Sequence, residues 1–402
     1  MLTFQEIQDA YEILKPVVKK TPLERSKAFS QILHTNVYLK QENLQTTGSF
    51  KIRGAYNKIY HLSKQERKNG VVCASAGNHA QGVAHASTLM GLKSTVYMPV
   101  YTSPTKIIAT KSYGATVVLE GVTYDDAAEA ATKYAKEKKM TFVHAFNDNF
   151  VIAGQGTIGF EIFEALPHVD VVVVPIGGGG LISGIALALK TLKPSVKIIG
   201  VEAEGAQSMK LSLEQNKIVP MKSIMTIADG IAVKTPKDLT FSLARQYVDT
   251  VVTVDDEEIA NALYLLLQRT KLIVEPAGAV ALAALLSKKI SYPQKNVVAV
   301  LSGGNINLSL LTQIIERGMM RQKLLAKVAV TVLDKPKALK DILTILADLG
   351  ANVQSIAHDR STTAVSVGFV RIIITFQTLG REQIEMIKKK FDHKKVQYHL
   401  LS

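Results

Sequence analysis

The feature that most constrains the fold is an alternation of short apolar runs with alanine-rich helical segments, which continues to about residue 310. Such runs are typical of buried strands, and strands that alternate with helices form parallel sheets covered by those helices. The strand-like runs are Val71–Ala74, Ser94–Met98, Thr116–Leu119, Val169–Pro175, Lys197–Glu202 and Val297–Ser302. The helical segments include Asn78–Met90, Asp125–Lys138, Leu181–Leu192 and Ala277–Lys288. The sequence therefore predicts an α/β region over residues 1–320.

The pattern changes after Arg321, where strand-like and helical segments follow one another in the order βαββαβ. Pro336 stands where a helix can start, and Gly350 suits the C-terminal cap of that helix. A second helix carries Ile384, Ile387 and Phe391 on one face. The strands are expected at Lys327–Leu333, Asn352–Ala357, Ala364–Phe376 and Val396–Leu400. This order is that of a ferredoxin-like fold, so we expect residues 323–402 to form a separate small domain.

The formal net charge of the 402 residues is +14, which fits either a nucleic-acid partner or an enzyme for anionic ligands. The lysines are scattered along the chain. Their densest clusters, at residues 388–390 and 394–395, have no interleaved aromatic residues and no groove-reading motif. We therefore expect no nucleic-acid partner.

Residues 171–189 carry no charge, and this length alone would suit a membrane span. Pro175 and four consecutive glycines interrupt the run, so it predicts a strand, a loop and a helix instead. At the N-terminus, Thr3 and Glu6 fit a helical capping box, not a secretory signal. The single cysteine, Cys73, cannot form an internal disulfide. Together these features predict a cytoplasmic protein without a membrane segment.

Lys51 follows a small polar turn, Thr47-Gly48-Ser49-Phe50, at the expected start of a helix. Burial and the positive end of the helix dipole would both lower the pKa of this lysine. A lowered pKa is what an amine needs to form an imine. By itself the motif decides little, because most lysines are solvated surface groups.

The segment Ser75-Ala76-Gly77-Asn78-His79 comes directly after a buried strand and opens the next helix. Its free backbone amides, with the side chains of Ser75 and Asn78, could bind a carboxylate. An ordinary helix cap with His79 at the surface is equally compatible with this pattern.

Two further turns follow buried strands. The glycines Gly177-Gly178-Gly179-Gly180 let backbone amides wrap an anion, and the helix that begins at Leu181 favours a phosphate there. The spacing is that of neither a P-loop nor a dinucleotide fingerprint. In Ser302-Gly303-Gly304-Asn305, the serine lies where α/β proteins bind ligands, although a capping serine would look the same.

Taken together, these motifs resemble the two-lobed, tryptophan synthase β-like fold-type II pyridoxal-phosphate enzymes, most closely the threonine/serine dehydratase family. The resemblance covers nearly all of residues 1–320, with a smaller lobe at about residues 48–150. The motifs that carry it are Gly48-Ser49-Phe50-Lys51-Ile52-Arg53-Gly54-Ala55, Ser75-Ala76-Gly77-Asn78-His79-Ala80-Gln81-Gly82, Ala153-Gly154-Gln155-Gly156-Thr157, Gly177 to Leu181, Glu275-Pro276-Ala277-Gly278-Ala279 and Ser302-Gly303-Gly304-Asn305.

This resemblance implies roles for four of these motifs. Lys51 would form the Schiff base with pyridoxal 5′-phosphate and act as the general base, beside a ring flanked by Phe50. Asn78 would contact the 3′-oxygen of the ring, and Ser302 the pyridine nitrogen, where a neutral hydroxyl favours elimination over transamination. The phosphate would bind at Gly177, Gly178, Gly179, Gly180 and Leu181. The substrate carboxylate would bind at Ser75, Gly77, Asn78 and His79.

Residues 323–402 resemble an ACT domain, a module that senses amino acids. The resemblance implies an amino-acid effector and a homodimer or homotetramer. The opening of the domain departs from the family pattern, because Pro336-Lys337 stands where that family has Pro-Gly. A structural role without an effector is therefore also open.

The implied reaction is the β-elimination of water from L-threonine, and from L-serine, which releases a 2-oxo acid and ammonia. Which of the two is preferred is not decided by the sequence. Serine racemases share these motifs but carry a second serine where this chain has Ala76, which disfavours racemisation. Sulfur-amino-acid synthases use a threonine-rich loop where this chain has Asn78-His79. A non-catalytic amino-acid sensor is the alternative from a different class.

A bound cation is a further expectation from the resemblance. Some relatives bind a divalent cation through a Glu and a nearby Asp. Glu202 matches the first, but Ser208 stands in place of the second. A monovalent cation held by carbonyl oxygens is equally compatible, so the metal is left unassigned.

Overall fold

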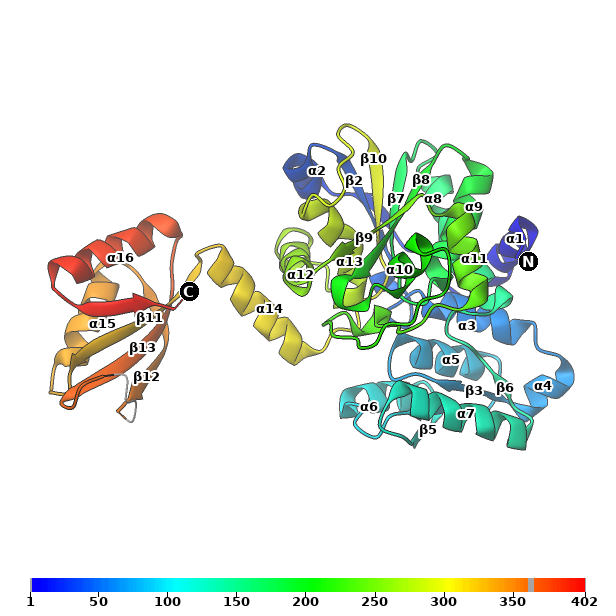
Figure 1. The fold of residues 1–402 in the computed structure, drawn as a ribbon, viewed down its shortest axis with the longest axis horizontal. Helices are drawn as coiled ribbons and strands as arrows, with labels where there is room; N and C mark the ends of the chain where they lie inside the picture. Colours follow the sequence, from blue (N-terminus) through cyan, green and yellow to red (C-terminus); the bar gives the residue numbers. More distant parts are fainter. Residues whose placement is uncertain (1, 361–364, 402) are drawn as a thin grey trace. The chain divides into compact units, whose positions relative to one another are not determined.

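The computed structural model describes residues 2–360 and 365–401, and these divide into two compact units, Met1–Asn307 and Leu308–Ser402. The first unit has two lobes, each built on a sheet (Figure 1). The α/β class and the parallel sheets predicted from the alternating pattern are confirmed. Within the described residues, none of the helices is at once long and apolar enough to cross a bilayer.

The larger lobe contains a sheet with the strand order β1-β2-β10-β7-β8-β9, in which only β1 runs antiparallel to its neighbour. Its strands are β1 (Leu23–Arg25), β2 (Asn36–Gln41), β7 (Val171–Pro175), β8 (Lys197–Ala203), β9 (Thr250–Val254) and β10 (Asn296–Leu301). Its helices are α1 (Phe4–Leu14), α2 (Lys27–Leu33), α8 (Asn149–Ala165), α9 (Gly180–Leu192), α10 (Ser208–Glu214), α11 (Asp238–Tyr247), α12 (Asp256–Thr270) and α13 (Pro276–Leu286), with short 3-10 turns η1 (Glu42–Leu44), η2 (Glu204–Ala206) and η3 (Asp229–Ile231).

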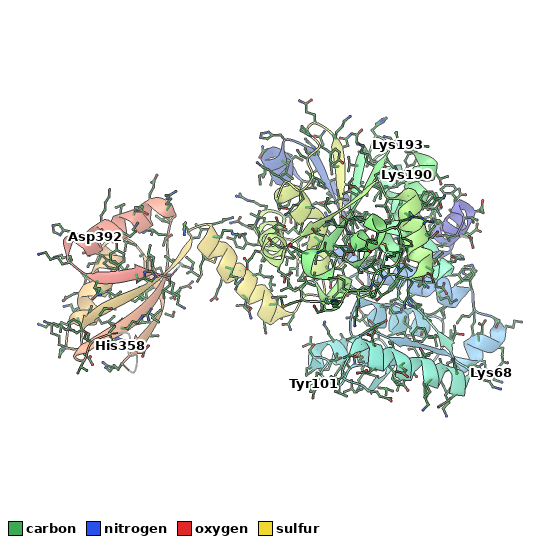
Figure 2. All side chains as sticks on the ribbon, in the orientation of Figure 1. Lys68, Tyr101, Lys190, Lys193, His358 and Asp392 are labelled. Atoms are coloured by element: carbon green, nitrogen blue, oxygen red, sulfur yellow. The ribbon has the colours of Figure 1, made fainter. Side chains whose placement is uncertain are left out.

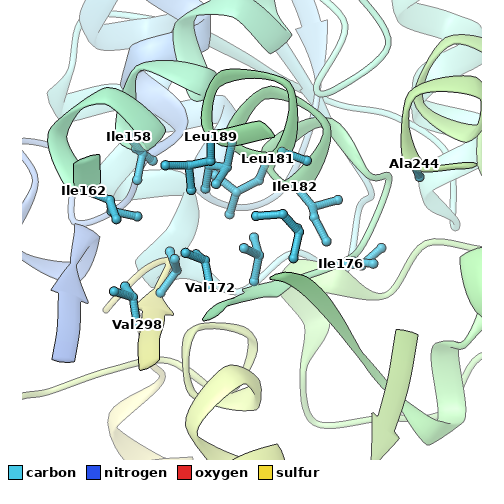
Figure 3. Close-up of a cluster of buried hydrophobic side chains, with 14 of the residues drawn as sticks. Ile158, Ile162, Val172, Ile176, Leu181, Ile182, Leu189, Ala244 and Val298 are labelled. Carbon is cyan, nitrogen blue, oxygen red and sulfur yellow. The ribbon is translucent and has the colours of Figure 1, made fainter. Parts of the chain in front are cut away.

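The main core of this lobe lies between one face of the sheet and helices α8 and α9. Figure 3 shows Ile158 and Ile162 of α8 and Leu189 of α9 gathered over Val172 and Val298 of the strands. Because side chains alternate across a strand, the neighbouring valines face the other side, where α13 packs against β7, β8, β9 and β10. Both faces of the sheet are thus covered, which explains why its strands read as continuous apolar runs.

The smaller lobe is a parallel sheet with the strand order β5-β4-β3-β6. Its strands are β3 (Val71–Ala74), β4 (Ser94–Met98), β5 (Thr116–Leu119) and β6 (Thr141–Phe142), and the helices around it are α3 (Lys51–Tyr60), α4 (Lys64–Asn69), α5 (Asn78–Leu89), α6 (Pro104–Ser112) and α7 (Tyr124–Lys138). Cys73 lies in its core, where burial raises the pKa of the thiol to about 12. Many of the scattered lysines of the sequence lie on the surfaces of the two lobes, for example Lys68 on the smaller lobe and Lys190 and Lys193 on the larger (Figure 2).

A buried ionic network joins helix α3 to the larger lobe. Arg53 is fully buried and donates two hydrogen bonds to Glu42, at 2.8 and 2.9 Å, and one of 2.7 Å to Glu161 of α8. Lys40 of β2 also pairs with Glu161, and its Nζ donates to the Thr21 carbonyl at 2.7 Å. Since each charge has an opposite partner, the cost of burying it is offset only while the network is complete. The helix that begins at Lys51 is therefore anchored within its first turn, at Arg53.

The second unit contains α14 (Leu308–Arg321) followed by a βαββαβ arrangement, as the pattern after residue 321 predicts. Its elements are β11 (Leu325–Leu333), α15 (Ala338–Asp348), β12 (Asn352–Asp359), β13 (Phe369–Gln377), α16 (Arg381–His393) and β14 (Gln397–Leu400). The sheet is antiparallel with the strand order β12-β13-β11-β14, and one apolar face packs against α15 and α16. The strand expected from Ala364 begins at Phe369, while Ala364 itself lies outside the described residues.

The start of α15 differs from the expectation that Pro336 opens the helix. The helix begins at Ala338, and Lys337 is the N-cap residue in a left-handed conformation with φ 78°. This backbone conformation favours glycine, because a Cβ atom crowds the following carbonyl oxygen. Lys337 therefore adopts the bend that a glycine would adopt at the same place. At the other end of the helix, Gly350 has φ 73°, as expected for a C-terminal cap.

We expect Lys337→Gly to stabilise the second unit by about 1 kcal/mol, because relief of the left-handed strain outweighs the extra freedom of glycine in the unfolded chain. Hydrogen exchange at the amides of α15 should slow about fivefold in the full-length protein. The matched control is Lys340→Gly, the same change inside α15, which should speed exchange because glycine costs about 1 kcal/mol in a helix interior. Faster exchange in both variants would show that Lys337 is not strained.

Candidate functional site

Lys51 is the first residue of α3, and its amine points to the segment between β6 and α8. The Nζ atom donates a 2.9 Å hydrogen bond to the carbonyl oxygen of Ala145 and lies 5.1 Å from the centre of the Phe50 ring. Burial lowers the pKa of Lys51 to about 8, against the opposing effect of the Glu275 charge. About a tenth of the amine is thus neutral at pH 7, far more than for an ordinary lysine, and the neutral form is the one that attacks a carbonyl group or takes up a proton.

The turn before Lys51 is bound to the turn after β10. Phe50 N donates to the Ser302 carbonyl at 3.2 Å, and Gly304 N donates to the Gly48 carbonyl at 2.8 Å. Asn305 adds a 2.9 Å hydrogen bond from its side chain to the Thr47 carbonyl. These contacts bring together two motifs that are about 250 residues apart in the sequence. They also bury Ser302 at the end of the central strand.

The asparagine loop, residues 75–79, runs from the end of β3 to the start of α5. Asn78 is held on two sides: its Nδ2 donates to Glu275 Oε1 at 2.6 Å, and its Oδ1 accepts from Asn305 Nδ2 at 2.7 Å. Ser75 Oγ accepts a 3.2 Å hydrogen bond from the backbone of Gly77, the N-cap residue of α5. The first-turn amides of this helix have no partner within the helix and are free for an anion.

His79 is not at the surface, as the simple capping interpretation expects. Its ring is buried, and Nε2 forms a 2.9 Å hydrogen bond with the Val143 carbonyl. Burial, and then the nearby charge of Lys51, lower the pKa of His79 to about 3, so the ring is neutral and Nε2 is the donor. The side chain therefore holds the loop against the β6–α8 segment, which leaves the backbone N–H as the group of His79 that could meet a ligand.

The glycine loop between β7 and α9 has no room for side chains. A Cβ atom at Gly178 would lie 2.2 Å from the Phe146 ring, and one at Gly177 would lie 2.9 Å from the backbone of Ile231. Gly179 has φ 87°, which suits glycine alone at low cost. The loop therefore presents bare backbone at the N-terminus of α9, next to Leu181, and this is the arrangement that binds phosphate groups.

Two buried polar side chains beside this loop and the Lys51 turn support a ligand site. Within the described residues, neither amide atom of Gln155 has a hydrogen-bond partner, and its Oε1 lies 2.9 Å from where a Cβ of Gly180 would be. The buried hydroxyl of Ser49 is likewise without a partner in the described part of the chain. Buried polar groups are rarely left unpaired, so these atoms fit a polar ligand with a phosphate group.

Glu275 and Asn305 are site residues to which the sequence patterns gave no role. Glu275 stands alone as a charge among the apolar residues 272–286, and a lone charge in such a run is a signal of a buried, partnered group. Phe146 carried no signal at all. It reaches the glycine loop only through the fold, where its ring also packs edge-on against His144 with centroids 4.6 Å apart.

The residues present do not fit the divalent-cation site suggested by Glu202. This buried carboxylate accepts hydrogen bonds of 2.9 and 2.8 Å from the backbone of Met209 and Lys210, while Ser208 Oγ donates to the Val233 carbonyl. Burial raises the pKa of Glu202 to about 8, despite these two donors. Across residues 2–360 and 365–401, no group of three or more His, Cys, Asp or Glu side chains could hold a metal ion.

Comparison with known proteins gives consistent results for both units. Residues 14–303 match the family described as pyridoxal-phosphate dependent enzyme, and residues 327–391 match the ACT domain. An L-threonine ammonia-lyase of Thermotoga maritima is 49% identical over 389 residues, which cover 97% of each chain.

Two solved structures are similar in fold. The processed form of threonine deaminase isoform 2 from Solanum lycopersicum has a TM-score of 0.75 and 39% identity, covering 79% of this chain and 88% of that one. Maize serine racemase also has a TM-score of 0.75, with 34% identity, covering 80% of this chain and 98% of that one.

The contact between Gly178 and Phe146 generates a paired prediction. Gly178→Ala places a methyl group inside the Phe146 ring, an overpacking that typically costs about 1–3 kcal/mol, and should displace the loop. We expect at least about tenfold weaker binding of pyridoxal phosphate, measured by titrating the cofactor-free protein and following fluorescence. Adding Phe146→Ala should restore part of this loss, because it removes the clashing ring. Unchanged affinity in Gly178→Ala would contradict the packing described here.

Proposed function

The chain belongs to the pyridoxal-phosphate dependent enzymes and carries an ACT domain, and from this premise we propose that it is a lyase that removes water and ammonia from L-threonine. The products are 2-oxobutanoate and ammonia, and L-serine would give pyruvate in the same way. The observation that carries this proposal is the position of Lys51, a buried amine with a lowered pKa. It is hydrogen-bonded to Ala145, whose neighbour Phe146 packs against the glycine loop, and its charge acts on His79 of the asparagine loop. The high identity to an L-threonine ammonia-lyase over almost the whole chain supports threonine as the main substrate.

The residues present fit pyridoxal phosphate at three points. The glycine loop and the first turn of α9, from Gly177 to Leu181, would hold the phosphate, and the unpaired Gln155 amide lies beside them. Asn78 and Ser302 would contact the ring from the ends of β3 and β10. The bound cofactor supplies the electron sink that makes the α-proton of an amino acid acidic.

The chain's own groups account for the remaining chemistry. The neutral amine of Lys51 removes the α-proton, and Phe50 and the Ala145 carbonyl keep this amine in place. The first-turn amides of α5, with Ser75, bind the substrate carboxylate and orient the α-hydrogen toward Lys51. The hydroxyl of Ser302 is neutral, which favours loss of the β-hydroxyl group over transamination. That group leaves as water, with a proton that the cofactor phosphate held by the glycine loop would supply, as in the family that the chain resembles. Water then converts the released enamine to the 2-oxo acid and ammonia.

The similarity to maize serine racemase makes racemisation the second candidate. Ala76 is the residue that argues against it. In the resembled racemases a second serine at this place exchanges a proton on the opposite face of the ring, and the methyl group of Ala76 cannot do so. Elimination should therefore exceed racemisation.

The test is a steady-state assay of 2-oxo acid release from L-threonine, L-serine and their D-isomers, with chiral analysis of the remaining serine. We expect L-threonine to give the highest kcat/KM, and D-serine to form at least about tenfold more slowly than pyruvate. This factor corresponds to about 1.4 kcal/mol between the two barriers. Cofactor-loaded protein that releases no 2-oxo acid from either L-isomer would refute the proposal. Formation of D-serine as fast as pyruvate would favour the racemase.

Regulation through the second unit is part of the proposal. An amino acid bound at the ACT domain would favour one arrangement of a homodimer or homotetramer and so change activity in the cytoplasm. Lys337 keeps the backbone bend expected for glycine, which supports a retained effector loop.

Threonine saturation curves of the full-length enzyme, with and without isoleucine or valine, test this regulation. A coupling of about 1–3 kcal/mol would change apparent affinity roughly 5- to 150-fold. An enzyme indifferent to every amino acid added would leave the ACT domain with a role in assembly only.

A further inference from the structure

Glu275 is a buried carboxylate at the start of α13, facing the site. Its side chain is 5% exposed, and it is the N-cap residue before Pro276. Its backbone N–H donates a 3.0 Å hydrogen bond to the Gly303 carbonyl, which fixes the main chain next to the turn after β10. A carboxylate so placed is costly unless a donor satisfies it. The donor is Asn78, whose Nδ2 lies 2.6 Å from Oε1.

The main chain at Gly303 packs closely against the contact between Glu275 and Asn78. A Cβ atom at Gly303 would lie 2.3 Å from Glu275 Oε1 and 3.2 Å from Asn78 Nδ2, so glycine is needed where the two side chains meet. On its other side, the Asn78 amide oxygen accepts from Asn305. Reversing the amide would place its oxygen against the carboxylate and its NH₂ against another NH₂. Asn78 is thus held in one orientation, with one N–H used by Glu275 and the second left for a ligand.

We propose that Glu275 is a positioning residue, which holds the Asn78 amide in the one orientation that presents its second N–H to the cofactor ring. This proposal rests on the proposed function for the identity of the cofactor, but not for the substrate. The carboxylate does not touch the reacting atoms. It acts through Asn78, and a hydrogen bond from an amide to an ionised carboxylate is about twice as strong as one between neutral groups.

The ionisation of Glu275 gives the contact a pH dependence. Burial, and then the like charge of Asp229 in η3, raise the pKa of Glu275 to about 7, while Asn78 of α5, Lys106 of α6 and Lys51 of α3 oppose that rise. Protonation removes the charge that the Asn78 N–H is bound to. The hold on Asn78 therefore weakens as the pH falls through about 7 and is complete above it.

The first experiment measures pyridoxal phosphate affinity without substrate, by titrating the cofactor-free full-length protein. Glu275→Gln keeps the shape of the side chain but removes its charge, and we expect about tenfold weaker binding at pH 8. Asn78→Ala should weaken binding as well, and the double variant should bind no more weakly than Asn78→Ala alone, since both changes break one contact. Additive losses, or wild-type affinity in Glu275→Gln, would overturn the proposal.

The second experiment follows the same affinity from pH 6 to 8.5 and needs no change in the buried residue. Asp229 is 62% exposed and paired with Lys106 at 2.6 Å. Asp229→Asn removes the like charge that faces Glu275, so the midpoint near pH 7 in the wild type should move to lower pH. In Glu275→Gln this step should be absent. A midpoint that stays in place in Asp229→Asn, or a step that survives in Glu275→Gln, would exclude Glu275 as its origin.

A matched control is Glu258→Gln, the same substitution at the start of α12. Glu258 hydrogen-bonds the Asp255 backbone and pairs with Lys289, so its loss should lower stability without changing cofactor affinity or its pH dependence. An equal loss of cofactor affinity in this control would show that the Glu275→Gln effect comes from a general loss of structure.

If the wild type binds the cofactor but releases no 2-oxo acid, the proposed function fails and the Glu275 proposal stands. If the wild type turns over threonine while Glu275→Gln binds the cofactor as the wild type does, the proposed function stands and the Glu275 proposal fails.

Discussion

The backbone hydrogen bonds between the Lys51 turn and the turn after β10 are the contacts on which the rest of the site depends. They join Gly48 and Phe50 to Ser302 and Gly304, so a lysine near the start of the chain is fixed to the central strand of the larger sheet. Gly48 makes the approach possible, because it has φ 71° and a Cβ atom there would lie 2.4 Å from Asn305 Oδ1. From this turn, the amine of Lys51 reaches the Ala145 carbonyl and donates a hydrogen bond to it. Burial in that position lowers its pKa.

The charged groups around the site are of two kinds: those that anchor helix α3, and those whose ionisation affects the ligand-binding side chains. Arg53, two residues after Lys51, is fully paired with Glu42 and Glu161, and this network anchors α3. Glu275, by contrast, has an amide and no cation as its hydrogen-bond partner, and burial, followed by the like charge of Asp229, raises its pKa to about 7. The difference follows from the partners: a buried ion pair is neutral as a whole, whereas the hydrogen bond from an amide offsets only part of the cost of burying a carboxylate.

Much of the fold could be predicted from local pattern. The six expected strands of the first unit are present as β3, β4, β5, β7, β8 and β10, because each is an apolar run whose character does not depend on its neighbours. The glycine loop follows from the same logic, since four consecutive glycines between a strand and a helix have few other uses. Sheet order could not be predicted: β10 lies between β2 and β7, which is a property of the assembled core. The prediction that Pro336 opens helix α15 was wrong for a local reason, because the helix begins only after the left-handed Lys337.

The parts of the candidate site that are continuous motifs could be predicted from the sequence. The contacts between these motifs could not. Asn78 forms hydrogen bonds with Glu275 and Asn305, which are 197 and 227 residues away in the sequence. No motif spacing predicts contacts between residues so far apart. His79 was open to two interpretations because its burial depends on the β6–α8 segment, which the sequence does not place. Phe146 carries no motif, and its contact with Gly178 exists only in the folded protein.

The central claim is that the buried amine of Lys51 is the group that binds pyridoxal phosphate. Treating the cofactor-loaded protein with borohydride, digesting it and sequencing the labelled peptide by mass spectrometry tests this directly. We expect a single pyridoxyl label on the peptide that contains Lys51, and loss of that label when Lys51 is replaced by Ala. A label on any other lysine in an active enzyme would contradict it.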